Sequence, residues 1–155
     1  MPWQAKVLTV SESVSAGTRE DESGAALSRR LGEAGFEVLE RMVVPDGIEP
    51  VAGALARLCD GFAGLVVTTG GTGFSPNDLT PEGTESVLER RAPALATAMQ
   101  LSDPKGRLSR GTAGTVGGAL VLNLPGSPRG ALECLEAVLD IVPHALELMA
   151  GGRPH

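Results

Sequence analysis

The chain has 155 residues, 42% of them hydrophobic and 21% charged, and its formal net charge is −6. This length matches one average domain, and the composition excludes a disordered or highly charged tail protein. The acidic net charge and the small number of aromatic residues argue against a nucleic-acid partner. No apolar run approaches the ~20 residues of a membrane-spanning helix, so no membrane span is predicted.

The N-terminal half alternates between short apolar runs and helical periodicity. Residues 5–10 predict a buried strand, and Leu27, Leu31 and Ala34 then share one face of a helix. Residues 36–44 predict a second strand. The spacing of apolar residues over 48–58 predicts a second helix.

The C-terminal half repeats this alternation. The β-branched run 64–69 predicts a third strand, and Thr80, which precedes a proline, predicts a capped helix start. A hairpin is expected from strands 113–116 and 119–124. Ser127-Pro128 predicts one long helix that ends near Met149, with a bend near Pro143.

Strands that alternate with helices predict an α/β fold with three α-β-α layers and a mostly parallel central sheet. We expect a single domain over residues 1–155. The N-terminus lacks the apolar segment of a signal peptide, which indicates a cytoplasmic protein. Ligands of such folds bind at the carboxyl ends of the strands, which selects the loops 11–22, 45–47, 70–80 and 125–127.

The loop over residues 68–82, TTGGTGFSPNDLTPE, carries the strongest signal. Its glycines expose backbone N–H groups that can form an anion-binding nest, and the hydroxyls of Thr69, Thr72 and Ser75 add donors. An acidic protein with few cations could bind phosphates this way. The run matches neither a P-loop nor a dinucleotide fingerprint. The alternative is a tight strand-to-helix connection, with Thr80 as a cap only.

Two other loops have a structural and a functional interpretation. In NLPGSP, residues 123–128, Gly126 and Ser127 offer donors to a second anionic or heterocyclic group, or form an ordinary Pro-Gly turn with a helix cap. The stretch 10–24 is long for a connection inside one domain, which favours a functional loop. Asp21 or Ser23 could instead simply cap the helix that follows.

Two carboxylates, Asp46 and Asp78, follow the ends of predicted strands. A helix cap and a turn residue explain them structurally. If their loops face one crevice, the two acids could hold Mg²⁺ bridging a triphosphate. Neither His144 nor His155 has a Ser or Cys partner in the sequence, so no catalytic triad is proposed.

The two cysteines, Cys59 and Cys134, lie in apolar, helix-like stretches. No CxxC motif or clustered Cys/His pair accompanies them, so the sequence predicts two core residues and no zinc or iron–sulfur framework.

At these residues the chain resembles the MoaB/Mog family of molybdenum-cofactor biosynthesis proteins, the molybdopterin adenylyltransferases. The combination of TTGGTG, a following aspartate, TPE and a downstream NLPGSP is highly specific. The matching stretches extend over nearly the whole chain: residues 9–21, 68–82, 108–114, 123–128 and 143–148.

The resemblance implies transfer of AMP from MgATP to the terminal phosphate of molybdopterin, with release of pyrophosphate. It assigns metal binding and catalysis to Asp46 and Asp78. The positions that match the family's substrate and nucleotide pocket are Ser11, Thr69, Gly70, Gly71, Thr72, Gly73, Ser75, Ser109, Pro125, Gly126 and Ser127. It further implies Mg²⁺ as cofactor, a homo-oligomer of three or six copies, and a downstream metal-insertion protein as partner.

The chain departs from the family pattern at Ser13 and Asn77, where relatives often carry arginine. Both changes remove positive charge, so phosphate contacts at these two positions are not expected. Two alternative functions remain at this point: a molybdopterin-binding protein without catalysis, and a structural α/β interaction domain.

Overall fold

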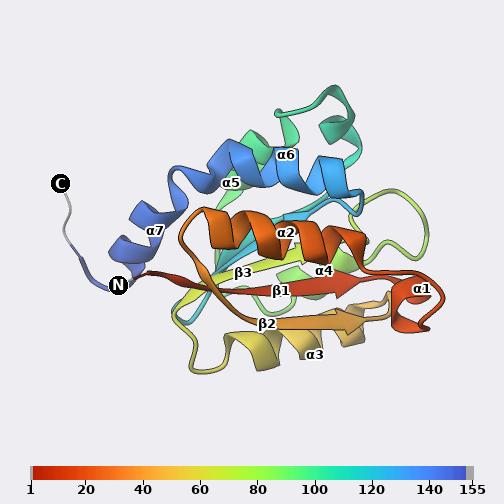
Figure 1. The fold of residues 1–155 in the computed structure, drawn as a ribbon, viewed down its shortest axis with the longest axis horizontal. Coiled ribbons are helices and arrows are strands. Elements are labelled where there is room, and N and C mark those ends of the chain that lie inside the picture. The colour runs from red at the N-terminus through yellow and green to blue at the C-terminus, as the bar shows by residue number, and fades with distance from the viewer. Residues whose placement is uncertain (1, 153–155) are drawn as a thin grey trace.

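The computed structural model describes residues 2–152, in which six strands form one sheet of order β2-β1-β3-β6-β5-β4 (Figure 1). The strands β2, β1, β3 and β6 are parallel neighbours, whereas β5 and β4 run antiparallel at one edge. The six strands are β1 (Gln4–Val10), β2 (Glu37–Val44), β3 (Gly64–Thr69), β4 (Arg90–Arg91), β5 (Ala113–Val116) and β6 (Ala119–Leu124).

Helices cover both faces of the sheet, which confirms the predicted α/β fold with a mostly parallel sheet. Figure 1 shows α2 and α6 on one side of the strands and α3 on the other. The helices are α1 (Glu12–Ser15), α2 (Glu22–Glu33), α3 (Ile48–Cys59), α4 (Thr80–Glu85), α5 (Pro93–Gln100), the 3₁₀ helix η1 (Pro104–Leu108), α6 (Pro128–Leu139) and α7 (Val142–Met149).

The central strands are buried on both faces because successive side chains point to opposite sides of a sheet. In β3, Leu65 and Val67 pack in one hydrophobic cluster with residues of α2, α5, α6 and α7, while Val66 packs in a second cluster with α3. Val7 and Leu8 of β1 divide between the same two clusters. Two cores therefore hold the middle strands rigidly, and the loops at their carboxyl ends inherit that position.

Cys59 and Cys134 are buried, each in one of these two cores, as expected from their apolar surroundings. Burial raises the pKa of the Cys59 thiol to about 11, so this thiol stays protonated and unreactive at neutral pH. None of the helices within residues 2–152 is both long and apolar enough to cross a bilayer.

The predicted C-terminal helix is wrong in one respect, because two helices replace it. The helix α6 ends at Leu139, and α7 begins at Val142 with Pro143 in its first turn. A proline lacks the N–H that an interior helix position donates, but it is tolerated in the first turn. Pro143 therefore starts a new helix instead of bending a continuous one.

Thr80 is not the predicted cap: it lies inside α4, whose N-cap position is occupied by Leu79. Its hydroxyl donates to the Gly70 carbonyl over 2.9 Å, and its backbone N–H donates to the Gly71 carbonyl over 3.0 Å. Thr80 thus connects the start of α4 to the glycine turn at Gly70 and Gly71. By contrast, Asp21, one of two possible caps of α2, and Ser127 do cap their helices, since each side chain accepts a hydrogen bond from the backbone N–H three residues later. Ser23, the other possible cap, instead donates its hydroxyl to the Gly126 carbonyl.

A buried asparagine joins three elements beneath the strand ends. Asn123 is 3% exposed, and its amide nitrogen donates to the hydroxyls of Thr68 on β3 and Thr84 on α4, each over 3.0 Å. Its amide oxygen accepts the backbone N–H of Thr112 over 3.1 Å. Because the bonds to Thr68 and Thr84 are buried and the bond to Thr112 is partly buried, the network depends on the complete set of partners.

We expect Asn123→Ala to lower the free energy of unfolding by about 2–4 kcal/mol, because it leaves several buried polar groups without a partner. Urea denaturation measures this change. Asn77→Ala is the matched control: Asn77 is exposed, and its truncation is expected to cost less than about 0.5 kcal/mol. Equal effects of the two variants would contradict the structural role of Asn123.

Candidate active site

The loops that follow β3 and β6 touch each other. The backbone N–H of Gly70 donates to the Leu124 carbonyl over 3.1 Å, and the Thr69 hydroxyl donates to the Pro125 carbonyl over 2.7 Å. These contacts arise because β3 and β6 are adjacent parallel strands in register from Gly64 to Thr69. The two loops selected from the sequence therefore form one structural unit.

Glycine is required in this unit at two successive positions. Gly70 and Gly71 have φ angles of +100° and +69°, a region that side chains disfavour. A Cβ atom on Gly70 would lie 2.2 Å from the Val10 carbonyl oxygen, and one on Gly71 would lie 2.3 Å from the Thr80 hydroxyl. The turn can therefore pack against the end of β1 and the start of α4 only without side chains.

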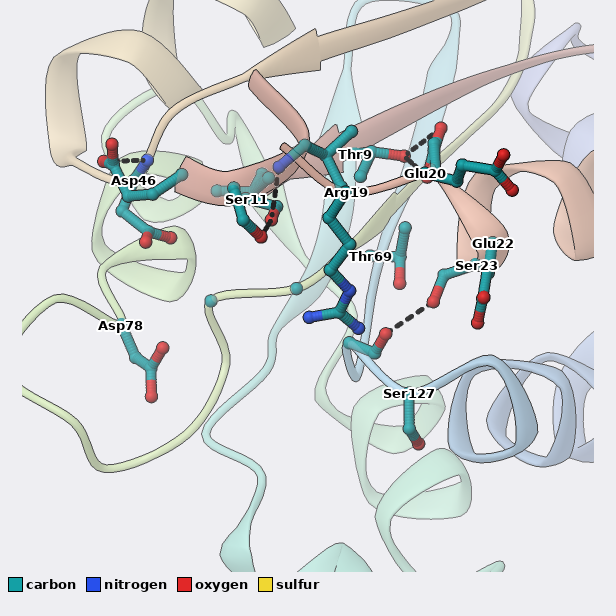
Figure 2. Close-up of a pocket in the computed structure, with 18 residues that line it drawn as sticks. Thr9, Ser11, Arg19, Glu20, Glu22, Ser23, Asp46, Thr69, Asp78 and Ser127 are labelled. Atoms are coloured by element: carbon teal, nitrogen blue, oxygen red, sulfur yellow. Dashed lines mark hydrogen bonds between the residues drawn. The ribbon is translucent and has the colours of Figure 1, made fainter. Parts of the chain in front are cut away.

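Two adjoining cavities open at these loops. The first, of about 500 Å³, lies between the carboxyl ends of the strands and the loop after β1 (Figure 2). The second, of about 590 Å³, extends toward η1 and the start of α6. Both are lined by Gly71, Asp78, Gly126 and Ser127, so we call the pair the joint cavity.

The joint cavity gathers all but one of the site residues predicted from the sequence. Four of them line the first cavity and not the second: Ser11, Asp46, Thr69 and Gly70. Four others line the second cavity and not the first: Thr72, Gly73, Ser109 and Pro125. Ser75 lines neither cavity; its backbone N–H donates to the Asp78 carboxylate over 3.0 Å. Ser75 thus orients Asp78 through its main chain.

The free donors in the joint cavity include main-chain groups. Within residues 2–152, the N–H groups of Gly71, Thr72 and Gly73 donate no hydrogen bond. The hydroxyl of Thr69, by contrast, donates to the Pro125 carbonyl, so it ties the loops together instead of serving a ligand as a donor. Unpaired amides in a glycine turn form a concave site for an anion such as a phosphate.

Carboxylates crowd the first cavity beside these donors. Burial, together with the negative charges of Glu12 and Asp78, raises the pKa of Asp46 above its ordinary value. Glu12 is held beside Asp46, since its carboxylate accepts the Asp46 backbone N–H over 3.0 Å. Figure 2 shows Asp46 and Asp78 on the same side of the cavity. Like charges held this close favour the binding of a cation.

This donor set fits magnesium. Asp46 and Asp78 offer oxygen atoms only, which suits a hard divalent ion. Within residues 2–152, no group of three or more His, Cys, Asp or Glu side chains is arranged to hold a metal ion. Magnesium commonly binds through one or two carboxylates and completes its shell with substrate phosphates and water. The pair could therefore hold the ion together with a phosphate-bearing ligand.

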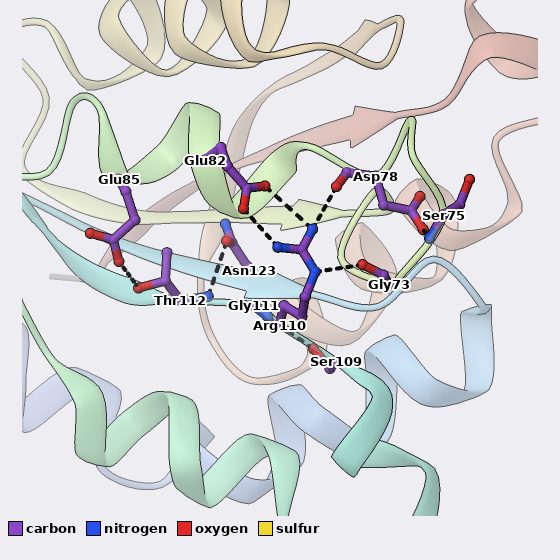
Figure 3. A network of polar contacts seen from close by, with 10 residues as sticks. All are labelled: Gly73, Ser75, Asp78, Glu82, Glu85, Ser109, Arg110, Gly111, Thr112 and Asn123. Atoms are coloured by element: carbon purple, nitrogen blue, oxygen red, sulfur yellow. Dashed lines mark hydrogen bonds and ion pairs between the residues drawn. The ribbon is translucent and has the colours of Figure 1, made fainter.

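Arg110 holds the loop over residues 70–78 in place by hydrogen bonds to its backbone carbonyls (Figure 3). Its guanidinium donates to the Gly73 carbonyl over 2.7 Å and to the Asp78 carbonyl over 2.6 Å, and its own N–H donates to the Thr72 carbonyl over 2.8 Å. An ion pair with Glu82, which lowers the pKa of that carboxyl, fixes the guanidinium in place. Arg110 thereby fixes both the free amides and the backbone of Asp78.

Sequence reasoning missed Arg110 and Glu12 as parts of the site. Glu12 lies in a loop that the strand-end rule had selected, so its position was a usable signal. Arg110 follows no predicted strand. It reaches the glycine loop because residues 109–112 run beside it, a tertiary contact that no local pattern predicts.

Comparisons with known proteins agree on one family. Residues 6–144 match the family described as a probable molybdopterin binding domain. A molybdopterin adenylyltransferase of Helicobacter pylori is 38% identical over 94% of this chain and 87% of that protein.

Solved structures give the same result. MoaB, a molybdopterin biosynthesis enzyme of Thermus thermophilus, superposes with a TM-score of 0.91 at 43% identity, covering 96% of this chain and 97% of that one. The molybdopterin biosynthesis Mog protein of Mycobacterium ulcerans gives a TM-score of 0.88 at 39% identity, over 95% and 99% of the two chains.

The crowding of carboxylates generates a prediction about stability. A raised pKa in the folded state means that ionised Asp46 opposes folding, and this opposition is complete once the pH exceeds the folded-state pKa. Without divalent cations, Asp46→Asn should therefore raise Tm at pH 7, and the gain should vanish at a pH low enough to protonate Asp46 in both folded and unfolded chains.

Thermal melts at both pH values, with and without Mg²⁺, test this expectation. Magnesium should stabilise the wild type more than Asp46→Asn, because it neutralises the crowded charges. Asp60→Asn serves as the charge-matched control, since Asp60 is exposed at the end of α3. A lower Tm of Asp46→Asn at pH 7 without metal would show that the carboxylate stabilises the fold.

Proposed function

The chain belongs to the molybdopterin-binding domain family and acts in molybdenum cofactor biosynthesis, and we propose that it transfers AMP from MgATP to the terminal phosphate of molybdopterin. The observation that carries the proposal is the joint cavity itself. Its shared wall of Gly71, Asp78, Gly126 and Ser127 lets two ligands, one in each cavity, meet at a common boundary. A transferase of this kind must bring a phosphate of one substrate to the α-phosphorus of the other.

The main chain of the glycine turn would bind the phosphates. The unpaired N–H groups of Gly71, Thr72 and Gly73 supply fixed donors that need no rearrangement when charge develops on the transferred group. Ser127 caps α6, so the positive end of that helix also faces the joint cavity. Such donors suit a protein whose net charge is −6.

Asp46 and Asp78 would hold magnesium beside these amides. Bound there, the ion would neutralise negative charge on the phosphates and polarise the transferred phosphoryl group. The Ser75 N–H keeps the Asp78 carboxylate oriented, and Glu12 keeps the backbone of Asp46 in place. The protein's own contribution is therefore to position the substrates and the ion and to stabilise their charge.

In the transfer, an oxygen of the pterin phosphate forms a bond to the α-phosphorus of ATP. The bond from that phosphorus to the bridging oxygen breaks, and pyrophosphate leaves with the electron pair. A phosphate monoester is already ionised at neutral pH, so its attack requires no general base. In agreement with this, the described residues that line the two cavities include no histidine. Orientation and electrostatic stabilisation would supply the rate enhancement.

Three further parts of the proposal rest on the sequence and the family resemblance, not on the geometry of the site. They are assembly into a homo-oligomer of three or six copies, a cytoplasmic location, and delivery of the product to a metal-insertion protein.

We expect Asp78→Asn to reduce AMP transfer at least about 100-fold, because it removes a charge that would hold magnesium at the phosphates. The assay follows pyrophosphate release and adenylated pterin after mixing protein, MgATP and molybdopterin. Asp140→Asn, a loss of charge at the exposed end of α6, is the control and should retain full activity.

The same assay separates the proposal from its two rivals. Tight pterin binding without ATP turnover by the wild type would indicate a binding protein without catalysis. Binding of neither substrate would indicate a structural or interaction domain. Full activity of Asp78→Asn would contradict the role given to that carboxylate.

A further inference from the structure

One positively charged side chain lines the first cavity. Among the described residues that line it, Arg19 is the single Lys or Arg, whereas Glu12, Glu20, Asp21, Glu22, Asp46 and Asp78 bring negative charge. Arg19 comes from the turn between α1 and α2. In Figure 2 its side chain extends over the cavity, and its guanidinium lies between Thr69 and Ser127.

The base of this side chain is fixed by the turn. The backbone N–H of Thr18 donates to the Ser13 carbonyl over 2.9 Å, and the Thr18 hydroxyl donates to the same carbonyl over 3.1 Å. These bonds fix Thr18, and with it the backbone of Arg19, near Ser13, and both Ser13 and Arg19 line the first cavity. The position of Arg19 therefore does not depend on a contact made by its guanidinium.

Arg19 has no protein partner within residues 2–152. Six other arginines form ion pairs, namely Arg30, Arg41, Arg57, Arg91, Arg110 and Arg129. Of the acids on its own loop, Glu20 and Glu22 form no ion pair within residues 2–152, and Asp21 and Glu12 are engaged elsewhere. Asp21 accepts hydrogen bonds from Thr9, from the Gly24 N–H and from Arg41, and Glu12 accepts the Asp46 N–H.

We propose that Arg19 binds the polyphosphate of the nucleotide in the first cavity, at the end that leaves as pyrophosphate. A guanidinium presents a planar pair of donors that matches two phosphate oxygens. The reacting α-phosphorus must lie at the wall shared by both cavities, where the substrates meet. Arg19 lines only the first cavity, so it faces the part of the polyphosphate beyond that point. The identity of the ligand rests on the proposed function.

Calorimetric titration with magnesium pyrophosphate, and separately with MgATP, tests this role at fixed ionic strength. Arg19→Gln should weaken pyrophosphate binding about tenfold, because it removes a charge-assisted pair of hydrogen bonds. Arg19→Lys keeps the charge but loses the planar pair, so it should weaken binding about threefold. Arg29→Gln is the matched control: Arg29 is exposed on α2, lines neither cavity, and should bind like the wild type.

The results distinguish this inference from the proposed function. If the wild type adenylates molybdopterin and Arg19→Gln binds both ligands as tightly as the wild type does, the role of Arg19 is wrong and the enzyme assignment stands. If Arg19→Gln weakens pyrophosphate binding but the wild type transfers no AMP, the anion site stands without the enzyme. Absence of pyrophosphate binding by the wild type, or an equal loss in Arg29→Gln, also overturns the inference.

Discussion

The contact between the ends of β3 and β6 is the constraint on which the rest of the structure depends. Gly70 donates to Leu124, Thr69 donates to Pro125, and a Cβ atom on Gly126 would lie only 3.3 Å from Cα of Gly70. Because both strands are buried on two faces, neither loop can move without disturbing a core. One wall of the joint cavity is therefore preformed.

The charges that line the site are a second constraint on its function. The chain is acidic, and the first cavity is more so, yet its proposed substrates are anions. Unpaired amides contribute partial positive charge without adding a basic side chain. Burial and the negative charges of Glu12 and Asp78 raise the pKa of Asp46, and a divalent ion bound at these carboxylates would offset that cost. Arg19 would complete this arrangement beside Ser13, a position where the family resemblance leads one to expect an arginine.

The sequence was informative where local chemistry decides the structure. Alternating apolar runs predict the layers, and the strand-end rule selects Gly70–Gly73, Gly126 and Ser127 from the sequence alone. Prediction from the sequence failed where a residue distant in the chain determines the contact. Thr80 binds a strand-end carbonyl instead of capping its helix, and Arg110 reaches the glycine loop from another segment. Residues 93–108, which form α5 and η1, carried no pattern strong enough to predict either helix.

The most direct test of the account is a crystal structure with Mg²⁺ and a non-hydrolysable analogue of ATP. The account predicts a phosphate oxygen within hydrogen-bonding distance of the Gly71 N–H at the shared wall, and one ion contacted by both Asp46 and Asp78. A triphosphate bound outside the joint cavity, or an ion held by neither carboxylate, would contradict it.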